Sequence, residues 1–485
     1  MVFQNNVLLG ASGSGTTTYT IDQSIRFNSV DNPALSKTFS GAGTEETWTF
    51  SCWFKRGAKE ETRNMIFSAG SAGSSFGGLE LGHGAGTSYG RAPLIFYNYT
   101  GGGYDWRLQT TRAFADFSAW YHVTVVSDTT NPIATERARM YINGIRITDF
   151  SSSISAPTFP ALNFSGNHWM GTTEHDIGTS IFTTQNFDGY LAEIYNIDGQ
   201  ALDCNSFGEF NSSGIWVPKA YSGTFGTNGF HIDGRDASDL GDDESGQGND
   251  FSSSGLAAHD QMIDTPNNNF AVLNPVSSSG LAATELTGGN LEMRNIDYID
   301  ATLPFPTSGK WYYELCVVSK TQGNWNYGNH YFRDIVDNFP DSNFTDYITT
   351  NFYHGSNFYS SSNWTDGDFW TNSNNPSAGD IYGFAWDSDN KKIWLAKNNT
   401  YFGSGDPAGN SGTPLGSGGT AGVEYVVTLY STLSQVMTIN FGQDDTFNNA
   451  KTSGSAGAAD GNGNGKFYYA PPTGFLALCT KNLGS

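Results

Sequence analysis

The chain has 485 residues, of which 14% are aromatic, 15% are charged and 59 are glycine. So few charges beside so many aromatic residues exclude a coiled coil or helical bundle and a disordered chain. The net charge of −23, without a local basic patch, excludes a protein that binds nucleic acid through phosphate contacts. The composition predicts an acidic, turn-rich all-β protein with more than one domain.

Residues 1–24 form a segment rich in Gly, Ser and Thr, which we expect to be ordered only by a partner. The segment has neither the basic start nor the apolar core of a secretory signal. No run in the chain reaches the ~18–20 apolar residues that span a bilayer, so we expect no membrane insertion. The four cysteines are far apart and form no CxxC pair, which predicts buried thiols in a protein made in a reducing cytoplasm.

Residues 25–203 contain short runs with the alternation of a strand that has one buried face. One such run has Trp48, Phe50, Cys52 and Phe54 at alternate positions. Residues 121–125 and 187–195 predict further strands. Between them, Asn143-Gly144 predicts the type I′ turn of a hairpin over residues 140–147.

Residues 204–275 are rich in Gly, Ser, Asp and Asn and have few strand signals. We interpret them as an acidic connector, ordered by packing rather than by a core of its own. Carboxylates in a Gly-bearing loop suit calcium, which prefers oxygen ligands, while a solvated acidic connector is the alternative. The candidate calcium ligands are Asp233, Asp236, Asp239, Asp242 and Asp243.

Residues 276–485 repeat the strand pattern of the first block. Alternate apolar residues over 311–317 predict one strand, and Asp389-Asn390 predicts the turn between strands over 383–387 and 392–396. We therefore predict an all-β fold with two β-sandwich, jelly-roll-like domains joined by an irregular connector.

Within the second block, residues 323–376 interleave aromatic side chains with Asn, Ser, Asp and Gly. Aromatic faces stack on the C–H faces of sugars while amides and carboxylates bond the hydroxyls, so this composition suits a glycan or receptor surface. The alternative is that the rings fill the core of the second sandwich or a subunit interface. The candidate binding residues are Trp325, Tyr327, Tyr331, Tyr359, Trp364 and Trp370.

Four segments in order resemble the laminin-G/concanavalin-like jelly roll over residues 25–203: 47–56, 120–123, 141–144 and 187–194. The block over 276–485 looks like a SPRY-type sandwich, on the segments 309–314, 383–387, 392–398, 440–443 and 469–475. Together with the opening Phe3–Leu8, this pair of folds resembles virion proteins of tailed bacteriophages.

The resemblance implies a structural or adhesive protein of a phage particle, a tail fibre or tail-associated component that binds a host-surface glycan or receptor. It implies that residues 1–24 attach the chain to other virion proteins, that the chain forms a homo-oligomer, and that it resides in the virion after assembly in the host cytoplasm. A capsid-decorating architectural protein without ligand is one alternative, and a glycan depolymerase on a lectin-like fold is another. We expect no enzyme, because the Glu-x-Asp-x-x-Glu pattern that places two carboxylates at the sugar in concanavalin-like glucanases does not occur. Calcium is the one cofactor that the sequence suggests.

Overall fold

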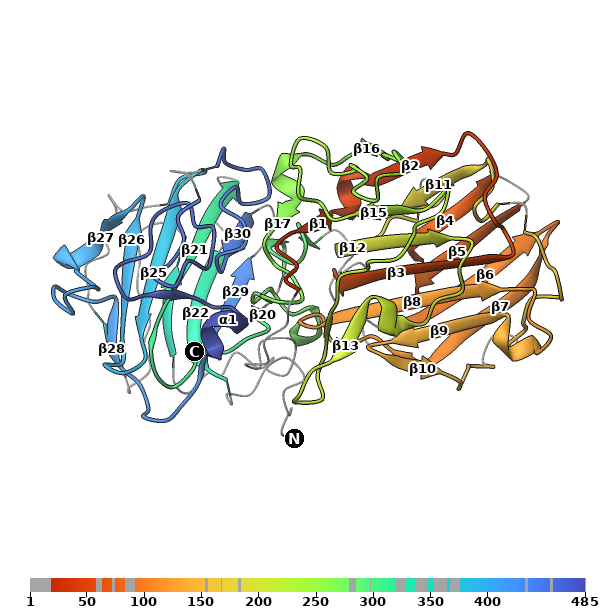
Figure 1. Cartoon of the computed structure of the whole chain (residues 1–485). Coiled ribbons are helices and arrows are strands. Elements are labelled where there is room, and N and C mark those ends of the chain that lie inside the picture. Colours follow the sequence, from red (N-terminus) through yellow and green to blue (C-terminus); the bar gives the residue numbers. More distant parts are fainter. Residues whose placement is uncertain are drawn as a thin grey trace. The chain divides into compact units, whose positions relative to one another are not determined.

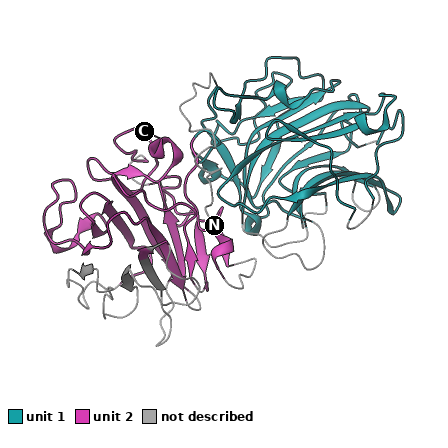
Figure 2. Ribbon diagram, turned by 90° about the horizontal axis from the view of Figure 1, so that it is seen from below, with its two compact units in different colours: residues 1–267 teal, residues 268–485 magenta. Residues whose placement is uncertain are grey.

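A computed structural model describes most of the chain. It leaves out residues 1–18, 58–62, 72–74, 83–91, 153–155, 167, 182–184, 279–284, 297, 320–327, 336–346, 352–363, 367–375, 432–434, 454–456 and 485. The described part is nearly all β, as predicted (Figure 1). The chain divides into two compact units, residues 1–267 and residues 268–485 (Figure 2).

Unit 1 is a sandwich of two antiparallel sheets, with strand orders β10-β9-β8-β3-β12-β1-β17 and β16-β2-β11-β4-β5-β6-β7 in the described residues, and with β15 paired to β12. The strands of the first sheet are β1 (Ser24–Phe27), β3 (Thr47–Arg56), β8 (Trp120–Asp128), β9 (Ala138–Ile142), β10 (Ile145–Ile147), β12 (Gly189–Asp198), β15 (Phe230–Ile232) and β17 (Gln261–Met262). Those of the second sheet are β2 (Ala34–Thr38), β4 (Asn64–Ser71), β5 (Ser75–Leu81), β6 (Pro93–Thr100), β7 (Gly103–Ala113), β11 (Glu174–Ile177) and β16 (Ser252–Ser254). A separate pair is β13 (Gly208–Phe210) and β14 (Trp216–Pro218), and the short 3₁₀ turns are η1 (Ser29–Asp31), η2 (Ala134–Glu136), η3 (Cys204–Ser206) and η4 (Ala258–Asp260).

The core of unit 1 lies between the two sheets and is rich in aromatic rings. Phe50 of β3 stacks on Phe67 of β4, with ring centroids 4.5 Å apart. Trp48 meets Phe96 of β6 edge-on at 5.7 Å. The predicted alternation on β3 is confirmed, because the four alternate residues Trp48, Phe50, Cys52 and Phe54 all belong to this core cluster. The predicted hairpin is also confirmed, since Asn143 and Gly144 both have the positive φ of a type I′ turn (47° and 79°).

Residues 204–267 differ from the predicted connector, because they are part of unit 1. Three of their strands extend the sheets: β15 pairs with β12, β16 with β2 and β17 with β1. They also cover the outer face of β3, where Trp53 packs in one cluster with Trp216 and Lys55 forms an ion pair with Asp264. β3 is therefore buried on both faces rather than on one, and the polar composition of 204–267 reflects a covering layer.

The N-terminal boundary also differs from the predicted one. Residues 1–18 lie outside the described part, but Tyr19 to Gln23 are described and β1 begins at Ser24. Ile21 is buried in unit 1, and its backbone N–H donates to Asn267 Oδ1 at 2.8 Å. The last residues of the predicted attachment segment therefore belong to the first sandwich.

Unit 2 is a second sandwich. In the described residues its larger sheet has the order β18-β19-β30-β21-β25-β26-β28-β24, with β27 on β26 and β31 on β21, and its smaller sheet has the order β20-β29-β22-β23. The larger sheet contains β18 (Leu286–Thr287), β19 (Glu292–Arg294), β21 (Lys310–Ser319), β24 (Trp364–Asp366), β25 (Ile381–Asp387), β26 (Lys392–Lys397), β27 (Thr400–Tyr401), β28 (Gly416–Gly418), β30 (Val436–Asn440) and β31 (Leu476–Ala477). The smaller contains β20 (Ile299–Asp300), β22 (Gly328–Asp334), β23 (Tyr347–Asn351) and β29 (Tyr425–Ser431). The short helical turns are η5 (Pro275–Ser277), η7 (Phe402–Ser404) and α1 (Thr480–Leu483).

The two sheets of unit 2 meet through aromatic contacts such as Phe332 on Trp386, at 4.8 Å between centroids. The unit begins at Asn268 rather than at the predicted residue 276. Its first residues pair with its last ones: Phe270 bridges Cys479, and the Thr480 backbone N–H donates to Asn269 O at 2.9 Å. This pairing explains the earlier boundary.

No helix in the described residues is both long and apolar enough to cross a lipid bilayer.

Candidate functional site

The predicted aromatic binding residues fall largely outside the described part of the chain. Trp325, Tyr327, Tyr359 and Trp370 lie outside the described residues. Tyr331 lies on β22 and Trp364 on β24, but only their backbones are described. The assignment of these six residues to a glycan or receptor surface stays a prediction.

Most of the five predicted calcium ligands hydrogen-bond their own loop, and calcium binding by these residues stays a prediction. Asp236 accepts from the backbone N–H of Ser238 at 2.8 Å, and Asp239 accepts from that of Gly241 at 3.2 Å. Such side chain to backbone bonds are common in polar turns. Burial, and after it the neighbouring carboxylates, raises the pKa of Asp242.

Asp243 has a positioning role in the same loop. Its carboxylate accepts from the backbone N–H groups of His231 (2.9 Å), Ser245 (3.0 Å) and Asn249 (2.8 Å). The first of these bonds ties the backbone of β15 at His231 to the loop. Of the five predicted ligands, Asp233 alone belongs to a convergent group of possible metal ligands in the described residues.

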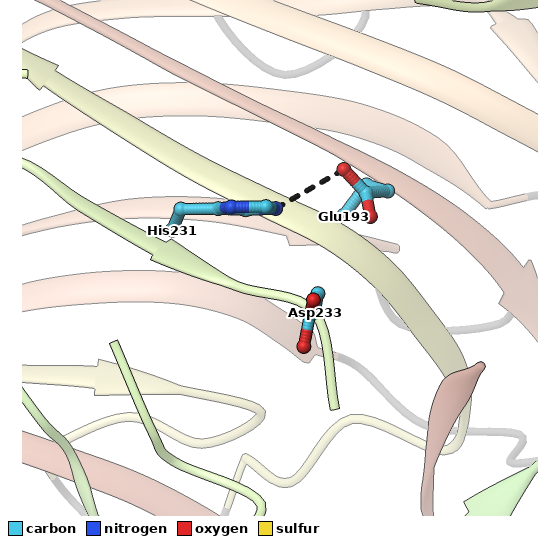
Figure 3. A group of neighbouring side chains, drawn as sticks. All are labelled: Glu193, His231 and Asp233. Atoms are coloured by element: carbon cyan, nitrogen blue, oxygen red, sulfur yellow. Dashed lines mark hydrogen bonds and ion pairs between the residues drawn. The ribbon is translucent and has the colours of Figure 1, made fainter. Parts of the chain in front are cut away.

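That group consists of Glu193, His231 and Asp233, whose ligand atoms lie within 4.8 Å of one another (Figure 3). Glu193 lies where the pairing of β12 with β3 shifts register, and its φ of 49° is left-handed. His231 lies on the neighbouring strand β15, opposite Tyr195 of β12. Its Nε2 is 3.1 Å from Glu193 Oε2. The bulge therefore turns a carboxylate toward an imidazole on the outer face of the sheet.

Aromatic hydroxyls surround the Glu193 carboxylate. The Tyr195 hydroxyl donates to Glu193 Oε2, and Tyr19 is also hydrogen-bonded to it. Burial raises the pKa of Glu193, but the hydrogen bonds from His231, Tyr195 and Tyr19 outweigh burial and hold that pKa below its usual value. The Tyr195 and His231 rings stack 4.2 Å apart. Glu193 is therefore a buried carboxyl group whose hydrogen-bond donors favour its ionised form.

A second group of chemically active side chains, which the sequence patterns did not predict, lies on the outer face of the second sheet. On β5, β6 and β7, alternate residues such as Leu79, Phe96 and Leu108 enter the core. The residues between them point away from it. Together with the neighbouring Arg63 they form what we call the β5–β7 face: Arg63, Phe76, Glu80, Tyr97, Tyr99, Tyr104 and Arg107.

The members of the β5–β7 face contact one another. Tyr97 donates to Glu80 Oε2 at 3.3 Å, and Arg63 Nε is 3.7 Å from Glu80 Oε1. Arg107 lies over the Tyr104 ring at 5.2 Å. Glu80 is 1% exposed, whereas Tyr104 is 37% exposed, so Tyr104 forms an accessible rim beside a buried carboxylate.

The electrostatics of this face follow from burial. Burial raises the pKa of Glu80 to about 7, although Arg63, Tyr97 and Arg107 all act to lower it. The β5–β7 face therefore combines two guanidinium groups, one titrating carboxyl group and exposed aromatic surface. The alternation of Tyr97, Tyr99 and Leu94, Phe96 on β6 was the signal in the sequence that could have located this face.

A serine and a histidine also lie together, but in an arrangement that does not activate the serine. Ser51 Oγ is 2.8 Å from His122 Nε2, and Trp216 Nε1 donates to His122 Nδ1 at 3.1 Å. Because an indole N–H can only donate, Nδ1 is the acceptor and Nε2 carries the proton. His122 therefore donates to Ser51 and cannot act as its base. Burial also lowers the pKa of His122 to about 3.

A family model described as the Concanavalin A-like lectin/glucanases superfamily matches residues 28–199. Mouse laminin alpha1 chain domains LG4-5 share 10% identity with the chain and cover 87% of it and 88% of themselves, with a TM-score of 0.26. The SPRY domain of human HERC1 (16% identity, 29% of this chain, 80% of that chain, TM-score 0.19) and tailspike protein 2 of Escherichia coli O157:H7 bacteriophage CAB120 (14%, 40%, 26%, TM-score 0.24) are similar over parts of it. No curated protein sequence matches the chain. Residues 28–199 thus have a laminin-G-type, lectin-like jelly-roll fold.

Proposed function

We propose that the chain is a non-enzymatic glycan-binding protein and that the β5–β7 face of unit 1 is its binding surface. The observation that carries the proposal is the exposed Tyr104 ring beside Arg63 and Arg107, with Tyr97 and Glu80 behind it. An aromatic ring offers apolar area to a sugar ring, and a few fixed polar groups set its orientation. The match of residues 28–199 to a lectin and glucanase superfamily supports this choice over other ligands.

The side chains of the β5–β7 face and of the Ser51–His122 pair favour binding without catalysis. A retaining or inverting glycosidase needs two carboxyl groups facing the sugar. The β5–β7 face as defined contributes one, Glu80, which is buried and shared by Arg63 and Tyr97. The Ser51–His122 pair has the wrong tautomer for nucleophilic catalysis.

A glycan array followed by titration of the best ligand tests the proposal. Tyr104→Ala should weaken binding by about tenfold, as a lost contact of about 1.4 kcal/mol would do. Phe210→Ala is the matched control, because Phe210 is also an exposed ring (51%) but lies on β13. Absence of any ligand, or equal affinity of the Tyr104 variant and wild type, would contradict the proposal. Incubation of the ligand with the protein, followed by analysis of its length, would expose a depolymerase.

We further propose that the protein works on a phage particle, tail-associated and homo-oligomeric, and held there by its N-terminal segment. The support is the sequence pattern of two such folds after the opening Phe3–Leu8. Several copies on one particle would raise the overall avidity of weak single-site binding. Electron microscopy of antibody-labelled particles tests the location. Label on the tail supports this role, label spread over the capsid supports the architectural alternative, and unlabelled particles contradict both.

A further inference from the structure

The group of Glu193, His231 and Asp233 on the outer face of the first sheet offers a mixed nitrogen and oxygen ligand set. Glu193 projects from the bulge of β12, His231 is on β15, and Asp233 follows β15 directly (Figure 3). At metal distances of about 2.0–2.1 Å, two ligands of a tetrahedral ion are about 3.4 Å apart. The 3.1 Å between His231 Nε2 and Glu193 Oε2 is close to this spacing.

Asp233 supplies a separate indication that a cation suits this place. Its side chain is 5% exposed, and its Oδ2 is buried and accepts no hydrogen bond, while Oδ1 accepts from the backbone N–H of Arg235. Arg235 Nε is 3.2 Å from Oδ2, in an ion pair that lacks hydrogen-bond alignment. The Arg235 side chain is 55% exposed, so it can move into solvent when a metal ion takes its place. A buried anionic oxygen without a hydrogen-bond donor needs a cation beside it, a place that the exposed Arg235 takes and that a metal ion could take instead.

Neighbouring residues hold His231 and Glu193 in place without a metal ion. Asp243 holds the His231 backbone at 2.9 Å, and the His231 ring stacks on Tyr195. The hydroxyl of Tyr195 orients the Glu193 carboxylate. Groups of this kind around the ligands set their orientation in metal sites.

We propose that Glu193, His231 and Asp233 bind a divalent first-row transition metal such as Zn²⁺, with water in the open position. An imidazole with two carboxylates suits such ions, whereas calcium takes oxygen ligands. The ion would join residues 231–233 of the covering layer to β12, and Tyr19, which contacts Glu193, would be held beside it.

The test is equilibrium dialysis of the full, untagged chain against Zn²⁺, with metal content measured per chain. One equivalent is expected for wild type, with at least a tenfold weaker affinity in His231→Gln and in Asp233→Asn. His259→Gln and Asp236→Asn are matched controls: His259 Nε2 is also near a carboxylate, 3.6 Å from Asp260, and Asp236 is an exposed carboxylate of the same loop. Both controls should bind as wild type does.

A second measurement uses the wild-type protein alone, so its result does not depend on whether a variant folds. Co²⁺ added to wild-type protein should give visible absorption bands of a four- or five-coordinate ion, and Zn²⁺ should abolish them. Wild type that binds no Zn²⁺, Zn²⁺ binding undiminished in folded Asp233→Asn, or binding of Ca²⁺ in preference to Zn²⁺ would each overturn the assignment.

Discussion

The ion pair between Lys55 on β3 and Asp264 tests whether residues 204–267 belong to the first sandwich. Lys55 Nζ is 2.7 Å from Asp264 Oδ2, and both side chains are 0% exposed. Trp120 Nε1 donates to the other carboxylate oxygen at 3.0 Å. Burial lowers the pKa of Lys55, and Asp264 partly offsets this effect. Asp264→Ala would therefore leave an ammonium group buried without its main counter-charge.

Removing one partner of a buried pair costs about 3–5 kcal/mol, whereas replacing both by apolar residues is often neutral. We expect Asp264→Ala to lower the free energy of unfolding by that amount, and Lys55→Met with Asp264→Leu to restore most of it. Glu136→Ala is the control, because its pair with Arg146 is partly exposed (27% and 35%) and should be worth about 0–1 kcal/mol.

Urea unfolding of the full chain, followed by tryptophan fluorescence, provides the assay. The transition of unit 1 is the one that Phe67→Ala displaces, since Phe67 is in its core. A loss below about 1 kcal/mol for Asp264→Ala in that transition would refute the reasoning. Residues 260–267 would then behave as a loosely attached segment rather than as a clamped layer.

Three further predictions follow from other parts of the structure. Phe67→Ala should cost about 3–5 kcal/mol in denaturant unfolding, because Phe67 is fully buried and stacks on Phe50, and a cost below about 1 kcal/mol would contradict its place in the core. The pKa of Glu80 is raised from 4.5 to about 7, so the folded state binds the proton more tightly and the stabilisation present below pH 4.5 is lost as the pH rises through 7. At about 1.4 kcal/mol per pKa unit, Glu80→Gln should gain about 3 kcal/mol relative to wild type between pH 4.5 and 7.5, and an unfolding difference that does not vary with pH would be the contrary result. Cys52, Cys204, Cys316 and Cys479 are all free and buried, and burial raises the pKa of Cys316 and of Cys479 to about 12, so a thiol reagent should label none of them in the native protein and all four in denaturant; rapid labelling of the folded chain would show otherwise.

Local patterns predicted the strands well, because alternation and turn residues act over a few positions. Trp48 and Phe50 are in the core as expected, and Asn143 forms the expected turn. The covering layer over 204–267 could not be found in this way. Its contacts, such as Lys55 with Asp264, join residues about two hundred positions apart, and its polar composition matches that of a solvated linker.

Side chains that meet in space were harder to find from the sequence than strands, for the same reason. Acidic residues close in sequence, such as Asp236 and Asp239, suggested a site, but they bond their own loop. The convergent group combines Asp233 with Glu193 from a distant strand, and only the pairing of β12 with β15 brings the two together. The alternation on β6 could have located the face, but the raised pKa of Glu80 could not be predicted from sequence, since it depends on burial and on Arg63, Tyr97 and Arg107 around it.

The first and last residues of unit 2 pair with each other, which bears on how this unit could be exchanged between chains. Asn269 and Thr480 exchange hydrogen bonds, at 2.9 Å in each direction, and Phe270 bridges Cys479. The polypeptide therefore enters and leaves this sandwich at one point, which is the arrangement that tolerates insertion into a host loop and circular permutation. Genetic exchange could thus graft or replace residues 268–483 as a cassette without opening either sheet, and the rest of the chain could acquire a different second module in a single event.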